Sequence, residues 1–385
     1  MAACSAAYCI ANVPGWLLPQ YIFGLMQRYH LTATAASIVP MVELLLIGAV
    51  AIGLGARPLR CSPRALVVTC TLMTVACNAV MTAMPSAATV LGARVPAGIA
   101  EAVVLYYSTA LLAPTPHPDR AYAIQNIANN VFGAVLLTSM SALANRTSGL
   151  ASMSYSAAPI LLLLPVLCWL PVRAEAATTA DPSHLAAGVR LAADRPAAFL
   201  LTGIIVLVAV NTYAHFAYAI PLGQRIGLTE TAVNVTLGAG GTLSIVGAIA
   251  AVYVTRHHGR LWPLLVALAL MLLADLLMVR PPVAFLFRAG VAANMALMYF
   301  MPPLLLGYAA AVDASGRSAG IVMGASVVAC AAAPLTGGVI MDAFGLDTFV
   351  VMAVACTALA AALLCLADRR VTNSAVIKDG RHDAP

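Results

Sequence analysis

Five charged residues lie inside long apolar runs of this sequence, namely Glu43, Arg94, Glu101, Asp275 and Arg288. A charged side chain inside a lipid bilayer costs a few kcal/mol unless it has a partner or faces a water-filled cavity. Burial favours the neutral form of a carboxyl group and a neighbouring guanidinium favours its charged form, so such a group can bind and release a proton. Each of these residues is therefore a candidate functional residue within a membrane.

The first three of these residues are predicted to act together. Glu43 and Arg94 lie about six and seven residues from the outer ends of the apolar runs 37–56 and 87–112, so they could pair at similar depth. Glu101 follows Arg94 by two helical turns, which places it on the same helix face about 10 Å deeper. We predict that Glu43, Arg94 and Glu101 form a proton relay. The alternative is a static buried pair that fixes helix packing.

The other two charged residues, Asp275 and Arg288, are predicted to form an ion pair, because both lie about five or six residues from the outer ends of their runs. The residue 197 positions before Asp275 is the uncharged Asn78. The buried carboxylates predicted to relay protons thus lie in the first half of the chain, and we interpret the pair of the second half as structural.

Polar and aromatic side chains recur at helical spacing in several runs. Asn12, Trp16 and Gln20 share one face at i, i+4 and i+8, and Asn211, His215 and Tyr218 do so at i, i+4 and i+7. Amides and phenols beside aromatic rings suit a small, partly polar organic solute. The predicted substrate-binding residues are Asn12, Trp16, Gln20, Asn126, Asn130, Asn211, His215, Tyr218, Arg288, Asn294 and Tyr299. The alternative is hydrogen bonding between helices, and His215 is either a proton carrier or a packing residue.

The composition decides which elements must position these residues. Of 385 residues, 62% are hydrophobic and 9% charged, and the mean hydropathy is +0.95. Soluble domains are about 25% charged, so a soluble enzyme, a disordered chain and a disulfide-rich module are excluded.

Nine cysteines without a Cys-x-x-Cys spacing are interpreted as small buried apolar residues. The glycine run 238–241 indicates close helix packing and not a phosphate loop.

The apolar runs predict an all-α membrane protein with twelve spans. Fourteen basic residues fall in the loops of one side and four in those of the other, which places both termini in the cytoplasm. Pro14 and Pro19 are expected to kink the first span. The predicted spans are 4–27, 37–56, 64–84, 87–112, 121–144, 151–171, 197–221, 232–254, 261–279, 283–309, 318–341 and 347–367.

The two halves of the chain resemble each other. QRYHLTATA at 27–35 and QRIGLTETA at 224–232 match at six of nine positions, each directly after the first span of its half. We therefore predict two six-helix pseudo-repeats. The predicted domains are an N-terminal bundle at 1–172, a cytoplasmic linker at 173–196, a C-terminal bundle at 197–370 and a cytoplasmic tail at 371–385.

Twelve spans in a repeated 6+6 arrangement with a central linker resemble the Major Facilitator Superfamily of secondary transporters. Arg94 and Gly98 resemble the family's fourth-helix signature of an arginine followed four residues later by glycine. The segment 53–64 matches the family's loop signature only in its glycines and basic residues, and the fifth-helix antiporter signature is absent. The resemblance implies that the first, fourth, seventh and tenth helices of the family's fold line a central cavity.

Together these patterns predict a secondary active transporter of a small organic solute that works by alternating access. Proton coupling is expected, and export is favoured over uptake. The alternatives are proton-coupled uptake of an organic anion and a receptor with a transporter fold that does not transport. We expect no enzymatic activity, no cofactor, metal or nucleic acid, and a monomer in the inner (plasma) membrane whose partners are its solute, protons and lipid.

Overall fold

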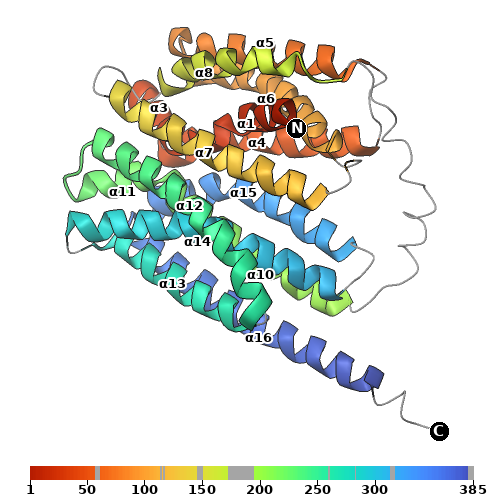
Figure 1. Ribbon diagram of the computed structural model, residues 1–385. Helices are drawn as coiled ribbons and strands as arrows, with labels where there is room; N and C mark the ends of the chain where they lie inside the picture. The colour runs from red at the N-terminus through yellow and green to blue at the C-terminus, as the bar shows by residue number, and fades with distance from the viewer. Residues whose placement is uncertain are drawn as a thin grey trace.

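A computed structural model describes the chain except for residues 57–60, 113–114, 116–117, 145–150, 172–194, 259–260, 282, 313–316 and 380–385. The described part is helical throughout and contains no strand (Figure 1). Nine of its helices are long and apolar enough to cross a membrane. Large apolar side chains such as Leu162 and Phe199 are exposed on the outer surface, as expected where a protein faces lipid. The prediction of an all-α membrane fold is confirmed, and the count of twelve spans stays a prediction.

The helices before the predicted linker form the first half of the molecule. They are α1 (Ala2–Ala11), α2 (Val13–Trp16), α3 (Leu18–Tyr29), α4 (Ala33–Ala56), α5 (Pro63–Ala79), the 3₁₀ turn η1 (Met81–Ala83), α6 (Ala87–Ala110), α7 (Pro118–Ala144) and α8 (Ala151–Leu167). Side chains cap several of these helices. Ser62 accepts a hydrogen bond from the amide of Ala65 at the start of α5, and Ser86 forms a capping box with Thr89 at the start of α6.

The helices after the predicted linker form the second half. They are α10 (Arg195–Ala217), α11 (Ala219–Arg225), α12 (Glu230–His258), α13 (Leu261–Val279), α14 (Ala284–Val312), α15 (Arg317–Phe344) and α16 (Thr348–Asp379). The last helix runs well past the predicted end of its span, and Figure 1 shows its end projecting from the bundle. The predicted tail at 371–385 is therefore helical as far as Asp379, and its remainder and most of the predicted linker lie outside the described residues.

The first span is divided into three short helices at Asn12 and Leu17. Pro14 and Pro19 stand in the first turns of α2 and α3, where a missing amide hydrogen costs no helical hydrogen bond. The predicted kinks are confirmed. The seventh predicted span is likewise divided at Tyr218 into α10 and α11.

The repeated sequence motif adopts the same turn in both halves. His30 ends α3 with a φ of 50°, and Gly227 follows α11 with a φ of 83°. Two residues later Thr32 and Thr229 each accept a hydrogen bond at 3.2 Å from the amide three residues on, which caps α4 and α12. Equivalent local geometry thus accompanies the sequence similarity of the two halves.

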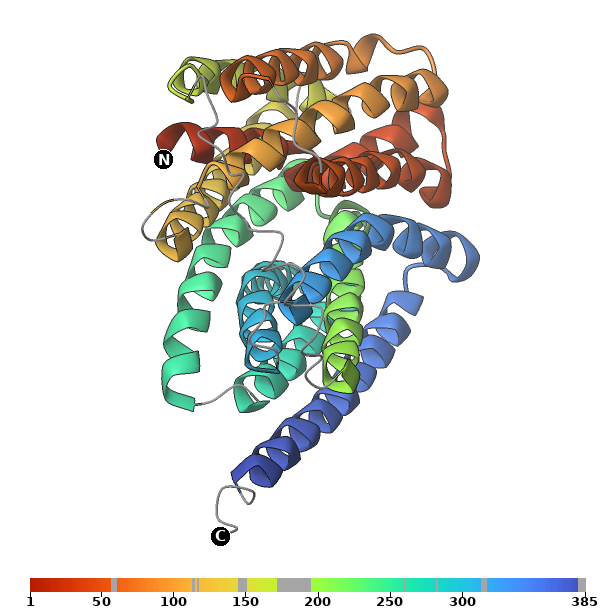
Figure 2. The ribbon, with the colours of Figure 1, turned by 90° about the vertical axis from the view of Figure 1, so that its right-hand side faces the viewer.

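The halves meet along two pairs of helices, α4 with α15 and α7 with α12 (Figures 1 and 2). Small residues allow the backbones to approach closely. A Cβ atom on Gly241 would lie 3.2 Å from the Cα of Ala134, and one on Gly238 would lie 2.3 Å from the hydroxyl of Thr138. The prediction that the run 238–241 serves close helix packing is confirmed.

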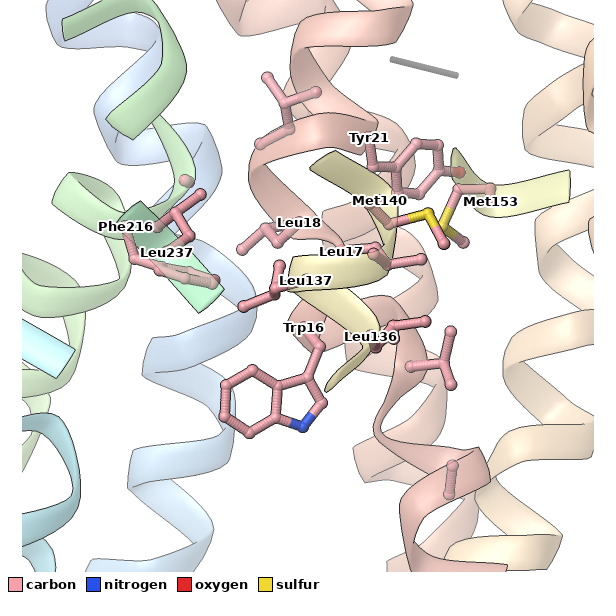
Figure 3. Packing of buried hydrophobic residues seen from close by; sticks show 14 of the residues in the cluster. Trp16, Leu17, Leu18, Tyr21, Leu136, Leu137, Met140, Met153, Phe216 and Leu237 are labelled. Carbon is pink, nitrogen blue, oxygen red and sulfur yellow. The ribbon is translucent and has the colours of Figure 1, made fainter. Parts of the chain in front are cut away.

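Apolar side chains of both halves also share one buried cluster (Figure 3). Leu17 and Leu18 from the kinked first span belong to this cluster together with Leu137 of α7. Phe216 of α10 and Leu237 of α12 join the same cluster from the second half. The kinked segment is therefore packed at the junction of the two halves, where it positions Trp16 and Gln20.

Candidate functional site

Glu43, Arg94 and Glu101 are brought together by α4 and α6 and are completely buried. The guanidinium of Arg94 donates hydrogen bonds to the carboxylate of Glu43 and to the side-chain oxygen of Asn78 on α5. Its Nη2 atom lies 3.6 Å from Oε1 of Glu101. The predicted pairing of Glu43 with Arg94 is confirmed, and Glu101 is within reach of the same guanidinium. We call these three residues the Arg94 group.

Gly98 makes the approach of the two helices possible. A Cβ atom at this position would lie 3.1 Å from the backbone oxygen of Glu43 and 3.3 Å from the Cβ of Leu46. Any larger residue would push α6 away from α4 at the depth of the ion pair. The fourth-helix signature found in the sequence thus has a direct packing role here.

The charges of the Arg94 group do not balance when both acids are ionised. One guanidinium then faces two carboxylates, and a net charge buried in a low-dielectric interior is strongly disfavoured. One proton shared between Glu43 and Glu101 makes the group neutral. Neither oxygen of Glu101 accepts a hydrogen bond from a described residue, whereas Glu43 accepts one from Arg94. Glu101 is therefore the acid better suited to hold the proton.

Asp275 lies in a second buried polar group, and its predicted ion pair with Arg288 is wrong. Its oxygens accept hydrogen bonds from the side-chain amides of Asn211, at 2.6 Å, and Asn294, at 2.9 Å. Nδ1 of His215 lies 3.9 Å from Oδ1. Arg288 is exposed, and no ion pair of Arg288 is found among the described residues.

The helical phase explains why Asn294 and not Arg288 reaches Asp275. The two residues are six positions apart on α14, which turns them about 240° from each other around the helix axis. The similar depths of Asp275 and Arg288 in their spans suggested that these two residues pair. The face of α14 that carries Asn294, however, is directed toward α13. Arg288 consequently lies on a different face from Asn294, so its predicted role in substrate binding gains no support from the group around Asp275.

Several predicted substrate-binding residues instead join the two halves. Gln20 donates a hydrogen bond to Asn234 at 2.9 Å, and Asn130 accepts one from Ser244 at 2.7 Å. The hydroxyl of Tyr218 lies 3.2 Å from the backbone oxygen of Ala33 and 3.1 Å from that of Pro334. For Gln20, Asn130 and Tyr218 the contacts fit the alternative given from the sequence, which is hydrogen bonding between helices.

A set of less buried side chains lies where the halves face each other. The rings of Trp16 on α2 and Tyr299 on α14 stack with centroids 5.9 Å apart. The hydroxyl of Tyr8 on α1 lies 3.4 Å from Oδ1 of Asn126 on α7, and Asn12 donates to the backbone oxygen of Tyr8. We call Tyr8, Asn12, Asn126 and Tyr299 the central polar surface, since each has a partly or fully exposed side chain.

Tyr8 was not predicted from the sequence. Asn129 was not among the predicted substrate-binding residues, although its amide oxygen accepts a hydrogen bond from the indole of Trp16 at 3.2 Å. Tyr8 precedes Asn12 by one helical turn, so its place on the same face was readable from spacing.

The predicted burial of the cysteines holds for Cys4 and Cys9, whereas Cys61, Cys168 and Cys365 are exposed. Within the described residues no cluster of metal-ligating side chains is found.

One end of the molecule, where α3 meets α4, carries a further contact between the halves. Asp342, near the end of α15, accepts hydrogen bonds from the amides of Ala33 at 3.0 Å and Thr34 at 2.7 Å. A carboxylate is well placed at a helix N-terminus, where free amides and the helix dipole favour negative charge. We call this contact the Asp342 cap.

Near the same end, Asp347 joins α15 to α16 and lies 3.0 Å from Arg225 and 3.1 Å from Arg280. Hydrogen bonds from Arg225, and to a lesser extent from Arg280, lower the pKa of this exposed carboxyl below its ordinary value. Charges outside the spans thus hold α11 and the α13–α14 connection against the start of α16.

A helical membrane bundle of two similar halves with a buried acid–arginine group defines a transporter-like protein. A sequence profile of the Major Facilitator Superfamily matches residues 3–299. The chain therefore belongs to that superfamily. No curated protein matches it by sequence.

Solved transporter structures share the fold over nearly the whole chain. A nucleoside transporter, NupG, is 11% identical with a TM-score of 0.77, and 94% of this chain and 97% of that chain are covered. A bacterial homologue of the human lysosomal transporter Spinster, in an inward-facing and unoccupied conformation, is 14% identical with a TM-score of 0.69, covering 96% of both chains. A D-xylose–proton symporter is also 14% identical, with a TM-score of 0.69 and coverages of 94% and 95%.

Proposed function

We propose that this protein is a proton-coupled secondary transporter of a small, uncharged, partly polar organic solute. The observation that carries the proposal is the Arg94 group, in which two wholly buried acids share one guanidinium. A static pair needs one acid only. The second acid gives the group a site that binds a proton in one conformation and releases it in another.

The coupling step follows from the geometry of Glu101. Arg94 and Glu101 both belong to α6, and Arg94 is hydrogen-bonded to Glu43 on α4. A movement that draws α6 away from α4 leaves Glu101, 3.6 Å from the guanidinium, as the remaining acid partner of Arg94. When Arg94 approaches Glu101, the charged form of this carboxyl is stabilised, and its proton leaves to water that enters in the other conformation, where the net charge of the group is no longer buried. When Arg94 returns to Glu43, Glu101 takes a proton again. We connect this movement within the first half with the rocking of the two halves, so that the change of conformation alters proton occupancy.

The solute site we propose is the central polar surface together with Trp16. These side chains supply two phenols, an indole and two amides, and none of them is charged. Stacked aromatic rings beside amides fit a neutral ring compound with several hydroxyl groups. Among the similar structures, one is a nucleoside transporter and one a D-xylose–proton symporter, which supports this choice of class.

The direction we propose is export, as favoured from the sequence. The excess of basic residues in the loops of one side places both termini in the cytoplasm, and the Asp342 cap and Tyr218 then close the outer end. Closure at the outer end supports loading of a solute from the cytoplasm, as an exporter requires. Uptake of an organic anion is the alternative, favoured by the missing antiporter signature and by arginines within the spans. Of these arginines, Arg94 is paired with Glu43 and Arg288 is exposed.

A two-stage experiment tests the proposal. Purified protein is screened by thermal unfolding in detergent against pentoses, nucleosides, aromatic carboxylates and lipophilic cations, because a ligand of the folded state raises the melting temperature. A stabilising solute is then loaded into proteoliposomes with an imposed pH gradient. Proton-driven movement by wild type and by Glu230→Gln, and its loss in Glu101→Gln, support the proposal. Stabilisation by carboxylates alone supports the anion carrier, and binding without movement supports the receptor.

A further inference from the structure

The second half contains a buried acid that the proposed coupling step does not use. Asp275 is completely buried on α13, and no arginine or lysine contacts it among the described residues. Two uncharged amides and one imidazole are its polar neighbours. An isolated carboxylate at this depth is costly, so the charge of this group needs an account.

Asp275 is held as a hydrogen-bond acceptor. Asn211 on α10 donates to Oδ2 and Asn294 on α14 donates to Oδ1, so helices on two sides fix the orientation of the carboxyl group. Neither amide carries a charge, so these bonds orient Asp275 without neutralising it. The nearest basic group is His215, one helical turn after Asn211 on α10.

His215 has one ring nitrogen without a hydrogen-bond partner among the described residues. Its Nδ1 atom lies 2.8 Å from the backbone oxygen of Asn211, which can only accept, so Nδ1 carries a hydrogen in either charge state. The other ring nitrogen, Nε2, is buried and has no hydrogen-bond partner in the described structure. The ring is held edge-on against Phe349 of α16, with centroids 5.3 Å apart. A proton added at Nε2 makes the imidazole positive beside Asp275.

Charge balance then fixes the number of protons. With no exchangeable proton the group carries Asp275 as an anion and a neutral His215, and its net charge is −1. With one proton, on Nε2 or on the carboxyl, the group is neutral. With two protons it is positive. Because a buried net charge is disfavoured, the group holds one proton in this conformation.

Other titratable groups do not replace His215 in this role. Among the described side chains of α16, Cys356 is near enough to Asp275 to be influenced by its charge, and a thiol adds no positive charge. Arg225 of α11 is exposed and paired with Asp347, Glu230 of α12 is half-buried at the helix start, and Arg288 of α14 is exposed. The described surroundings therefore leave the imidazole as the only basic neighbour of Asp275.

We propose that Asp275 and His215 form a second proton-binding site, located in the second half of the transporter. The inference rests on the proposed proton-coupled function, since an exchangeable proton here has a role only if the halves alternate between two conformations. The site occupies the position of Asn78 in the first half, 197 residues earlier, where an amide orients Arg94. Each half thus holds one proton, by an acid with arginine in one case and an acid with imidazole in the other.

Infrared difference spectroscopy of the purified, solute-free protein between acidic and alkaline buffer tests the site. Wild type is expected to show protonation bands of a buried carboxyl or imidazole, and a component of these bands is lost in Asp275→Asn and in His215→Gln. Asparagine keeps the size of the side chain and stands naturally at the matching position 78. Glu230→Gln, at the start of α12, is the matched control and keeps the component.

The outcomes separate this inference from the proposed function. Loss of a component in Glu101→Gln but none in Asp275→Asn or His215→Gln overturns the second site and leaves the Arg94 group as the coupling site. Loss in Asp275→Asn and His215→Gln but not in Glu101→Gln supports the second site and contradicts the assignment of Glu101. Each variant is first compared with wild type by size-exclusion profile and melting temperature, and His215→Gln serves where Asp275→Asn fails to fold.

Discussion

The two buried charge groups balance the negative charge of their acids in different ways. The Arg94 group contains a guanidinium that is always positive, so its two acids compete for one permanent partner. The group around Asp275 contains an imidazole that becomes positive only by taking up a proton. In the proposed mechanism the guanidinium of the first group exchanges its acid partner, and the second group gains or loses its positive charge. The two halves share a helical plan, but polar substitutions at matching positions give them separate electrostatics.

The largest expected effect follows from removing the permanent charge. Arg94→Ala leaves two acids buried without a cation and is expected to lower the free energy of unfolding by about 3–5 kcal/mol, the usual cost of breaking a buried ion pair. The melting temperature in detergent measures this loss. Arg288→Ala is the matched control on an exposed arginine and is expected to change stability by less than about 0.5 kcal/mol. Equal effects of the two variants would contradict the comparison.

A smaller loss of stability is expected for substitution of Asp275, whose neighbour His215 is positive only when it is protonated. Asp275→Asn removes the anion and leaves a neutral group, so the loss of stability is expected to be about 1 kcal/mol, the ordinary worth of a hydrogen bond that is altered but not orphaned. Asn78→Asp makes the converse change in the first half and adds a third acid beside Arg94. Unfolding curves of both variants would sharpen the comparison, and a greater loss for Asp275→Asn than for Arg94→Ala would refute it.

Helix spacing at the Arg94 group gives a third prediction. Gly98→Val places methyl groups against the backbone oxygen of Glu43, which lies 3.1 Å from the Cβ position. Overpacking of this kind costs about 1–3 kcal/mol. Gly92→Val on the same helix is the control, because nothing lies within 4 Å of its Cβ position. Comparable melting temperatures for the two variants would show that Gly98 has no special packing role.

The smallest change in stability is expected for Asp347, whose ion pairs lie outside the spans. The pKa of Asp347 is lowered in the folded protein by Arg225 and Arg280, so its contribution to stability is complete above the unfolded pKa of about 3.9. The contribution is lost as the pH falls through the lower folded pKa. Melting temperatures of wild type and Asp347→Asn are expected to differ slightly in neutral buffer and to converge in acid. A difference that grows on acidification would contradict the assignment.

The features predicted best from the sequence are the helical membrane fold, which follows from composition, and the pairing of Glu43 with Arg94, which lie at similar depth in their spans. Glu43 and Arg94 were paired correctly because both lie one or two turns into neighbouring spans and α4 and α6 pack together. The same argument failed for Arg288, because depth ignores the direction in which a helix turns its faces. The Asp342 cap was missed because the predicted span ended at residue 341, one position before the aspartate, whereas α15 continues to Phe344.

Contacts between the halves were beyond the reach of spacing arguments. Spacing on one helix placed Gln20 on a polar face but did not identify Asn234 as its partner 214 residues later. Asn130 is buried and accepts a hydrogen bond from Ser244 because α7 packs against α12. Which residues form hydrogen bonds between the halves depends on how the halves are placed relative to each other. A residue pattern within one helix carries no information on that placement.

The central claim is that solute movement is coupled to a proton held by Glu101. The most direct measurement is the pH change inside proteoliposomes, reported by a trapped indicator dye, when a stabilising solute is supplied on one side. The account predicts a solute-dependent pH change in wild type and in Glu230→Gln, and none in Glu101→Gln even though solute binding by thermal shift is retained. Solute movement without a pH change in wild type, or an unchanged pH response in Glu101→Gln, would contradict it.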